Sequence, residues 1–178
     1  MDFEGCFGQS KHKPLGVPPC STPSAMQFNS EKDFESHLRE LIRKNILPLN
    51  SELIMLDSKK AVDILLCLNG KKPALYFLEL KYAQQHHGRC GTGQSKGGGF
   101  QPEILRRKPV YFETNMRWIL GIDSVDGYWF LPNSVVCNHL SGGSIGTKFN
   151  NIAKRLFAQV PSVSEEALIE GLKQWLEL

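Results

Sequence analysis

The stretch AVDILLCLNGKKPALYFLELKY, residues 61–82, decides the fold of this chain. Two runs rich in leucine, β-branched and aromatic residues flank the turn-forming segment 69–73, so the stretch predicts a β-hairpin. Charged residues interrupt the apolar runs at three positions, Asp63, Glu79 and Lys81. Because side chains of a strand alternate between its faces, Glu79 and Lys81 share one face, and Asp63 on the partner strand can point the same way.

Charges embedded in apolar strands cost free energy unless something pairs with them. Two neighbouring carboxylates repel each other, and a hard divalent cation such as Mg²⁺ compensates for that repulsion. A lysine beside the carboxylates can orient a water molecule or a phosphate. The hairpin therefore favours a metal site that handles phosphate. The alternative is an edge hairpin with Glu79 and Lys81 on a solvated face, or paired to each other across the pleat.

This hairpin resembles the core of the PD-(D/E)XK nuclease superfamily, which carries an Asp on one strand and Asp/Glu-x-Lys on the next. Here these positions are Asp63 and Glu79-Leu80-Lys81, while Val62 stands where the family often has proline. The resemblance covers about residues 30 to 82. It implies a deoxyribonuclease in which Asp63, Glu79 and the carbonyl of Leu80 bind Mg²⁺, or Mn²⁺ in its place, and Lys81 positions the attacking water.

A helix is predicted just before the hairpin, in SEKDFESHLRELIRKNIL. Ser30 is a good N-cap followed by acidic residues, and the helix should run to about Asn45. Its apolar stripe is Phe34, Leu38, Leu41 and Ile42. Glu35 lies at the edge of this stripe and Glu40 points away from it. Since the resembled nucleases often place a Glu on this helix, Glu35 is the expected fourth catalytic residue; the alternative is a solvated boundary side chain.

The segment that follows the hairpin is basic and rich in glycine. Residues 81–108 carry a net charge of +5 in a chain whose total is +3, which indicates a polyanionic partner. Residues 83–101 predict a long loop, either functional or simply solvated. Arg and Gln match guanine and adenine edges, and basic groups contact phosphates. The predicted DNA-binding residues are Arg89, Gln94, Lys96, Gln101, Arg106, Arg107 and Lys108.

The rest of the chain predicts further strands and helices. A first strand is expected at 53–57, and others at 110–113, 116–123 and 127–132, with an Asp126-Gly127 turn. Residues 132–148 read as irregular, and helices are expected at 149–160 and 164–178, covering the sheet. The aromatic residues of the late strands are predicted to lie in the core: Trp118, Tyr128, Trp129 and Phe130.

Composition and length favour one α/β domain. A proline-rich arm, residues 1–28, precedes a domain at 29–178, expected to hold a central mixed β-sheet flanked by helices. The chain has 41% apolar and 22% charged residues and no membrane-length apolar run or secretory leader. Its five scattered cysteines favour free thiols in a reducing cytoplasm. His86, His87 and Cys90 resemble half a zinc site, but a polar loop is the better interpretation.

The sequence thus predicts a Mg²⁺-dependent endonuclease with DNA as its partner. Within the superfamily the chain is similar to small type II restriction endonucleases, which implies a homodimer acting on palindromic sites. An alternative of a different class is a catalytically inactive nucleic-acid-binding module with the same fold. RNA remains a third substrate, although no RNA-specific motif favours it.

Overall fold

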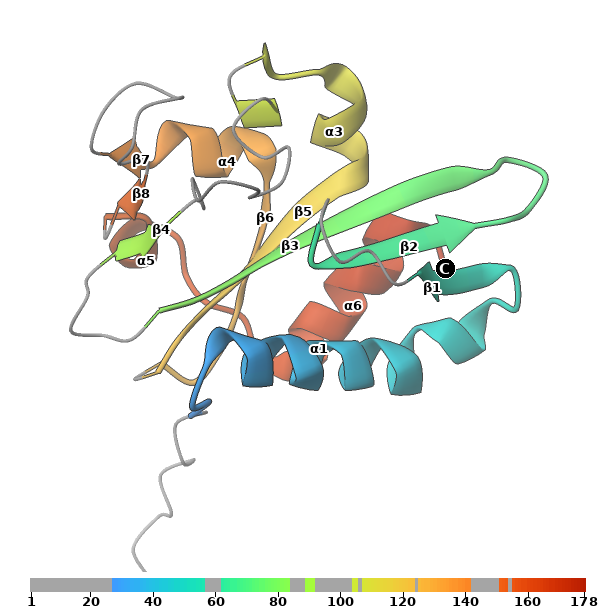
Figure 1. Cartoon of the computed structure of the whole chain (residues 1–178), viewed down its shortest axis with the longest axis horizontal. Helices are drawn as coiled ribbons and strands as arrows, with labels where there is room; N and C mark the ends of the chain where they lie inside the picture. The colour runs from blue at the N-terminus through green and yellow to red at the C-terminus, as the bar shows by residue number, and fades with distance from the viewer. Residues whose placement is uncertain are drawn as a thin grey trace, which may run out of the picture.

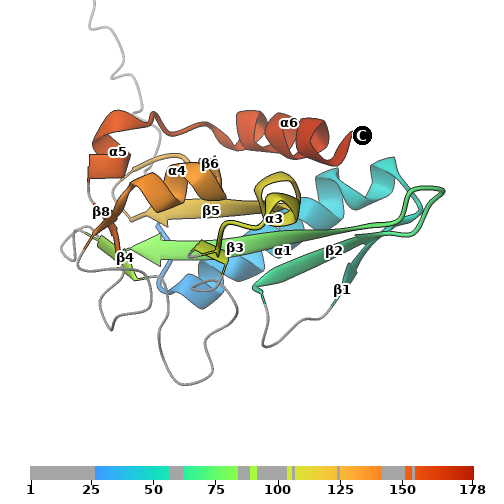
Figure 2. The same ribbon diagram turned by 90° about the horizontal axis from the view of Figure 1, so that it is seen from above.

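A five-stranded mixed sheet forms the centre of the protein (Figures 1 and 2). The computed structural model describes residues 27–56, 62–83, 89–91, 104–105, 107–123, 125–141, 151–153 and 155–178. The sheet has the order β1-β2-β3-β5-β6, in which β3 and β5 run parallel and the other neighbours antiparallel. Its strands are β1 (Leu53–Leu56), β2 (Ile64–Leu68), β3 (Ala74–Ala83), β5 (Met116–Ile122) and β6 (Trp129–Pro132).

Helix α1 (Glu31–Asn45) begins and ends where the sequence predicts. The hydroxyl of Ser30 accepts a hydrogen bond from the main-chain N–H of Asp33 at 3.1 Å, which caps the first turn. Glu35 lies at the boundary and Glu40 is exposed, as the periodicity of the helix predicts. A short 3₁₀ turn, η1 (Leu47–Leu49), then leads into β1.

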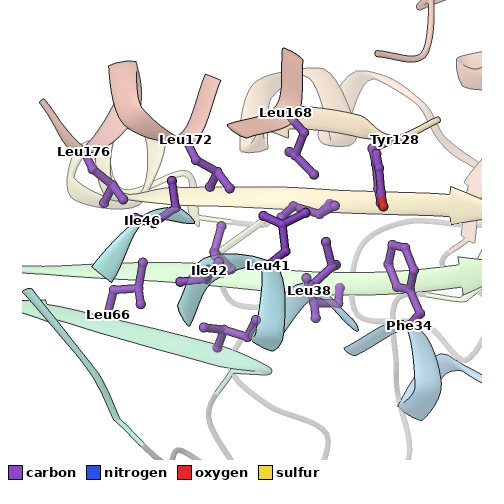
Figure 3. Packing of buried hydrophobic residues seen from close by; sticks show 14 of the residues in the cluster. Phe34, Leu38, Leu41, Ile42, Ile46, Leu66, Tyr128, Leu168, Leu172 and Leu176 are labelled. Carbon is purple, nitrogen blue, oxygen red and sulfur yellow. The ribbon is translucent and has the colours of Figure 1, made fainter. Parts of the chain in front are cut away.

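One face of the sheet packs against α1 and α6 (Glu165–Leu176). Figure 3 shows leucines of α6 meeting the apolar stripe of α1 over the sheet strands. The sheet contributes Ile64 and Leu66 from β2, Leu78 and Leu80 from β3, and Ile119 from β5. Ser164 caps α6, with its hydroxyl accepting a hydrogen bond from the N–H of Ala167 at 3.3 Å. These contacts pack one face of the β2–β3 hairpin against α1 and α6.

The opposite face carries a second apolar cluster, centred on β5 and β6. Because side chains alternate along β5, Met116, Trp118 and Leu120 point into this cluster while Ile119 points into the first. Helices α3 (Val110–Asn115), α4 (Asn133–Asn138) and α5 (Arg155–Gln159) cover this face. Trp118, Tyr128 and Trp129 are buried and Phe130 is half-buried, which confirms their predicted core position.

Four sequence predictions are wrong in this second half of the chain. The strand expected at 110–113 is helix α3, the irregular stretch 132–148 contains α4, and the long helix expected at 149–160 is a strand followed by α5. The predicted loop 83–101 also contains a strand. Pro109 and Pro132 precede α3 and α4 directly, each with extended backbone at the N-cap. The strands missed are β4 (Arg89–Gly91), β7 (Leu140–Ser141) and β8 (Asn151–Ala153), which form a small antiparallel sheet of order β4-β8-β7.

The described part of the chain forms one α/β domain, as the composition predicts. Its cysteines Cys67 and Cys137 are free thiols. None of the helices in the described ranges combines the length and the apolar character needed to cross a bilayer. The predicted arm, residues 1–28, lies outside these ranges except for its last two residues.

Candidate active site

Strand β3 carries the acidic and basic residues of the predicted site. Leu80 points into the α1 and α6 core and is fully buried, so its neighbours Glu79 and Lys81 point to the opposite face. The side chain of Glu79 is 1% exposed and lies beside Trp118 in the parallel β3–β5 register. The alternative of a solvated hairpin is therefore wrong for Glu79. The other half of that alternative, a pair between Glu79 and Lys81, is present.

Asp63 lies just before β2, at the point where β3 continues past its partner. The last paired residues of the hairpin are Ile64 and Leu78. Beyond them, the main-chain N–H of Leu80 donates to Asp63 Oδ2 at 2.7 Å instead of to a strand carbonyl. This hydrogen bond places the Asp63 carboxylate directly beside the main chain of β3.

The ammonium group of Lys81 is the meeting point of the predicted metal ligands. Its Nζ lies 2.8 Å from Glu79 Oε1, 2.8 Å from the carbonyl oxygen of Leu80 and 3.9 Å from Asp63 Oδ2. Glu31 Oε1 is 3.2 Å from the same nitrogen. The Lys81 side chain is only 12% exposed. Three carboxylates and one carbonyl thus converge on a single cationic group, and two of these carboxylates, Glu79 and Asp63, are predicted metal ligands.

Helix α1 brings Glu35 to the same place through Arg39. The guanidinium Nε donates to Glu35 Oε1 at 2.7 Å, and Nη2 donates to the main-chain carbonyl of Asp63. Arg39 therefore ties the helix to the start of β2. The structure brings together all four residues predicted to be catalytic, which are Glu35, Asp63, Glu79 and Lys81.

Sequence reasoning missed Glu31 and Arg39, although a signal was available. Glu31, Glu35 and Arg39 are spaced by four residues, and residues at this spacing lie on one face of a helix. Once Glu35 is placed at the site, the same periodicity points to the residue one turn before it and the residue one turn after it.

The pKa values of Asp63 and Lys81 are both raised, but for different reasons. Burial raises the pKa of Asp63 above its usual value; the Lys81 ammonium and the N–H of Leu80 oppose this shift, and Glu35 adds to it. Burial would lower the pKa of Lys81, but Glu79, Asp63 and Glu31 more than offset it, so this pKa is raised. Lys81 is therefore an ammonium at neutral pH. A proton acceptor would need the opposite shift.

Asp63→Asn is expected to raise the Tm of the metal-free protein at pH 7. Since the folded-state pKa of Asp63 is raised, the folded protein holds this proton more tightly than the unfolded chain does. The stability linked to that proton is present below the unfolded pKa, near 3.8, and is lost as the pH rises through the folded pKa. Asn stays neutral and still accepts from Leu80, so the variant avoids this loss. Thermal unfolding measured from pH 7 toward pH 4 should show that the Tm difference between Asp63→Asn and the wild type becomes smaller. An equal Tm for the two proteins at pH 7 would contradict the prediction.

The oxygen ligands at the site suit a hard cation, although they are few. Among the residues that the structure describes, no three His, Cys, Asp or Glu side chains form a metal-binding group. The convergent donors are instead two carboxylate oxygens and one main-chain carbonyl, all oxygen ligands of the kind Mg²⁺ prefers. They already surround a cationic nitrogen, which shows that the position accepts positive charge.

The predicted DNA-binding residues are only partly described. Arg107 and Lys108 are exposed beside helix α3, and the main chain of Arg89 lies in β4. The zinc candidate Cys90 also lies in β4, whereas His86 and His87 are outside the described residues. The remaining predicted DNA-binding residues fall outside them as well: Gln94, Lys96, Gln101 and Arg106.

Comparison with protein-family models, with curated proteins and with solved structures gives no match to this chain. The chemistry of the residues themselves therefore carries the functional conclusion. The most informative of these are the buried Glu79, the Leu80 carbonyl, Asp63 and the ammonium of Lys81.

Proposed function

We propose that this protein is a metal-dependent phosphodiesterase that cleaves DNA, with Asp63, Glu79 and the Leu80 carbonyl as the ligands of Mg²⁺. The observation that carries the proposal is the convergence of these three donors on one cationic nitrogen at the end of the hairpin. The order of elements α1, β1, β2 and β3 is also the helix, strand, hairpin order that the resemblance implies.

The charge balance of the site supports a divalent cation. Its ion pairs join four described carboxylates to two described cationic side chains: Glu31, Glu35, Asp63 and Glu79 to Arg39 and Lys81. When all of these groups are ionised, this described set has two negative charges in excess. Glu79 is buried and the side chains of Glu35 and Asp63 are about one-third exposed, so unbalanced charge is costly here, and one Mg²⁺ or Mn²⁺ would offset the excess.

The side chains supply positioning and charge for the reaction. A bound Mg²⁺ polarises the phosphate and lowers the pKa of a water ligand. The Lys81 ammonium donates hydrogen bonds and offsets negative charge that develops on the phosphate. Arg39 bonds to Oε1 of Glu35, so among the described residues Oε2 of Glu35 has the capacity to accept a hydrogen bond from the attacking water. Burial of Glu79 beside Trp118 keeps its carboxylate fixed.

DNA is the proposed substrate because basic residues follow the site in the chain. The excess of positive charge in residues 81–108 suits a phosphate backbone, and Arg107 and Lys108 are exposed. A type II restriction-like endonuclease acting as a homodimer is the narrower proposal within this class. It rests on the resemblance rather than on a contact in the described residues.

The test is cleavage of supercoiled plasmid DNA by the purified protein with Mg²⁺, with Mn²⁺ and with EDTA. We expect nicked or linear DNA only with a metal, and loss of cleavage in Glu79→Ala and in Lys81→Ala. DNA retention in a gel-shift assay with no cleavage under any metal would contradict the enzyme and support the inactive binding module. The same assay with single-stranded RNA in place of the plasmid tests the alternative that the substrate is RNA.

Arg39→Met is expected to slow cleavage by about 10–100-fold, the usual loss when a residue that orients a catalytic ligand is removed. The variant loses the hydrogen bonds to Glu35 and to the Asp63 carbonyl. Because Arg39 acts through these groups, kcat should fall while KM for DNA changes little. The matched control is Arg43→Met on the same helix, where an exposed arginine lies 3.7 Å from Glu40. An equal loss in both variants would contradict the positioning role.

A further inference from the structure

Lys81 occupies the position that the metal needs. Its Nζ lies 2.8 Å from both Glu79 Oε1 and the Leu80 carbonyl oxygen. Mg²⁺ binds its oxygen ligands at about 2.0–2.1 Å and tolerates little distortion. A cation on these two oxygens would lie in contact with the ammonium, and two positive charges at such a separation repel strongly. In its present position the ammonium therefore opposes the binding of a metal to these oxygens.

Glu31 already accepts one hydrogen bond from the ammonium and can retain it alone. Its Oε1 is 3.2 Å from Lys81 Nζ, and its side chain is 50% exposed in the first turn of α1. Lysine has a flexible four-carbon stem, so Nζ can shift toward Glu31 without losing its ion pairing. Glu31 does not belong to the proposed ligand set, which leaves its carboxylate free for this purpose once the metal is bound.

We infer that Lys81 is an internal competitor of the metal: its ammonium closes the site in the metal-free protein and moves to Glu31 when Mg²⁺ binds. This inference rests on the proposed function, because it concerns the same ligands. It assigns to Glu31 the role of the partner that Lys81 keeps when the metal takes the other oxygens. The movement would also carry the ammonium away from Glu79 and Asp63 and toward the exposed carboxylate of Glu31, where a phosphate of the substrate could reach it.

The experiment measures Mn²⁺ affinity by isothermal titration calorimetry in a double-mutant cycle, without DNA. Lys81→Met is expected to tighten Mn²⁺ binding by about tenfold, because no competitor has to be displaced. Glu31→Gln is expected to weaken binding by about threefold in the wild-type background and to have no effect in the Lys81→Met background. Glu40→Gln, an exposed residue on the same helix, serves as the control for the change in charge and should leave affinity unchanged.

The cycle separates this mechanism from a general electrostatic effect. If Glu31→Gln weakens Mn²⁺ binding equally in both backgrounds, Glu31 acts only as a nearby charge and the inference is overturned. No tightening in Lys81→Met would overturn it too. Should Lys81→Met fail to fold, Glu31→Gln alone decides, because an unchanged affinity would contradict the role of Glu31.

A different experimental result would refute the proposed function. If neither the wild type nor Lys81→Met binds Mn²⁺ at millimolar concentration, the metal site itself is wrong. If the wild type binds Mn²⁺ and cleaves plasmid DNA while the cycle shows no coupling, the nuclease stands and only the competition by Lys81 is rejected.

Discussion

Glu79→Gln is expected to lower the rate of DNA cleavage by about 10³-fold, the size of loss seen when one preorganised electrostatic group is removed from an active site. Glutamine has nearly the same shape but no charge, so it binds Mg²⁺ poorly and no longer balances Lys81. The side chain is 1% exposed and lies 2.8 Å from Lys81 Nζ, which leaves no room for a compensating shift. Single-turnover cleavage of a plasmid with excess protein measures the chemical step directly.

The matched control is Glu40→Gln, which makes the same chemical change at an exposed position of α1. It should cleave at the wild-type rate. Glu79→Asp retains the charge on a shorter side chain and should keep part of the activity. Cleavage by Glu79→Gln within about tenfold of the wild type would remove this carboxylate from the mechanism, since a lost metal ligand costs more than that.

Trp118→Ala is expected to lower the free energy of unfolding by about 3–5 kcal/mol, the range for large aromatic residues cut back in a core. Trp118 is fully buried in the second cluster and pairs in register with Glu79 across the parallel strands. The variant would lose the apolar contacts of the ring and leave a cavity next to the site. Urea unfolding followed by circular dichroism gives the free energy, with an unchanged m-value as the check on two-state behaviour.

Trp118→Phe separates packing from hydrogen bonding at the same position. The indole N–H donates to Asn133 Oδ1 at 2.6 Å, and Asn133 in turn donates to the Phe112 carbonyl at 2.8 Å. Phenylalanine keeps an aromatic ring but leaves the buried amide oxygen without this donor, at an expected cost of about 1–3 kcal/mol. A loss in Trp118→Phe as large as in Trp118→Ala would show that the hydrogen bond, not the ring, dominates.

Local signals in the sequence were enough for the first half of the fold. Ser30 predicts the start of α1 because its hydroxyl caps the first turn, and the apolar stripe of that helix predicts its buried face. Residues 69–73 predict the hairpin turn, since turn formers lie between two apolar runs. Face alternation then places Glu79 and Lys81 together on β3.

The second half of the fold depends on contacts distant in sequence. Val110 and its neighbours have strand propensity, yet they form α3, where Tyr111 bonds to the main chain of Leu75 and Phe112 packs on Phe77. Strands β4, β7 and β8 have two or three residues each, too few for any periodicity to be visible. Tertiary packing overrides local preference in such segments.

The candidate site shows the same division. The pattern of the hairpin predicts which carboxylates and which lysine belong to the site. It does not predict which of these groups form ion pairs. No feature of the sequence states that Lys81 Nζ would lie on the Leu80 carbonyl, or that Arg39 would reach the carbonyl of Asp63. Both contacts depend on how far β3 extends beyond β2 and on the angle at which α1 crosses the sheet.

The main-chain N–H of Leu80 donates its hydrogen bond to the side chain of Asp63. In a regular sheet the acceptor would be a main-chain carbonyl of the neighbouring strand. A proton on this nitrogen can exchange with solvent only when that carboxylate moves aside. Deuterium uptake at this one amide therefore reads out the opening of the site without any substrate. A spectroscopist could follow it residue by residue while cations, nucleic acid or inhibitors are added.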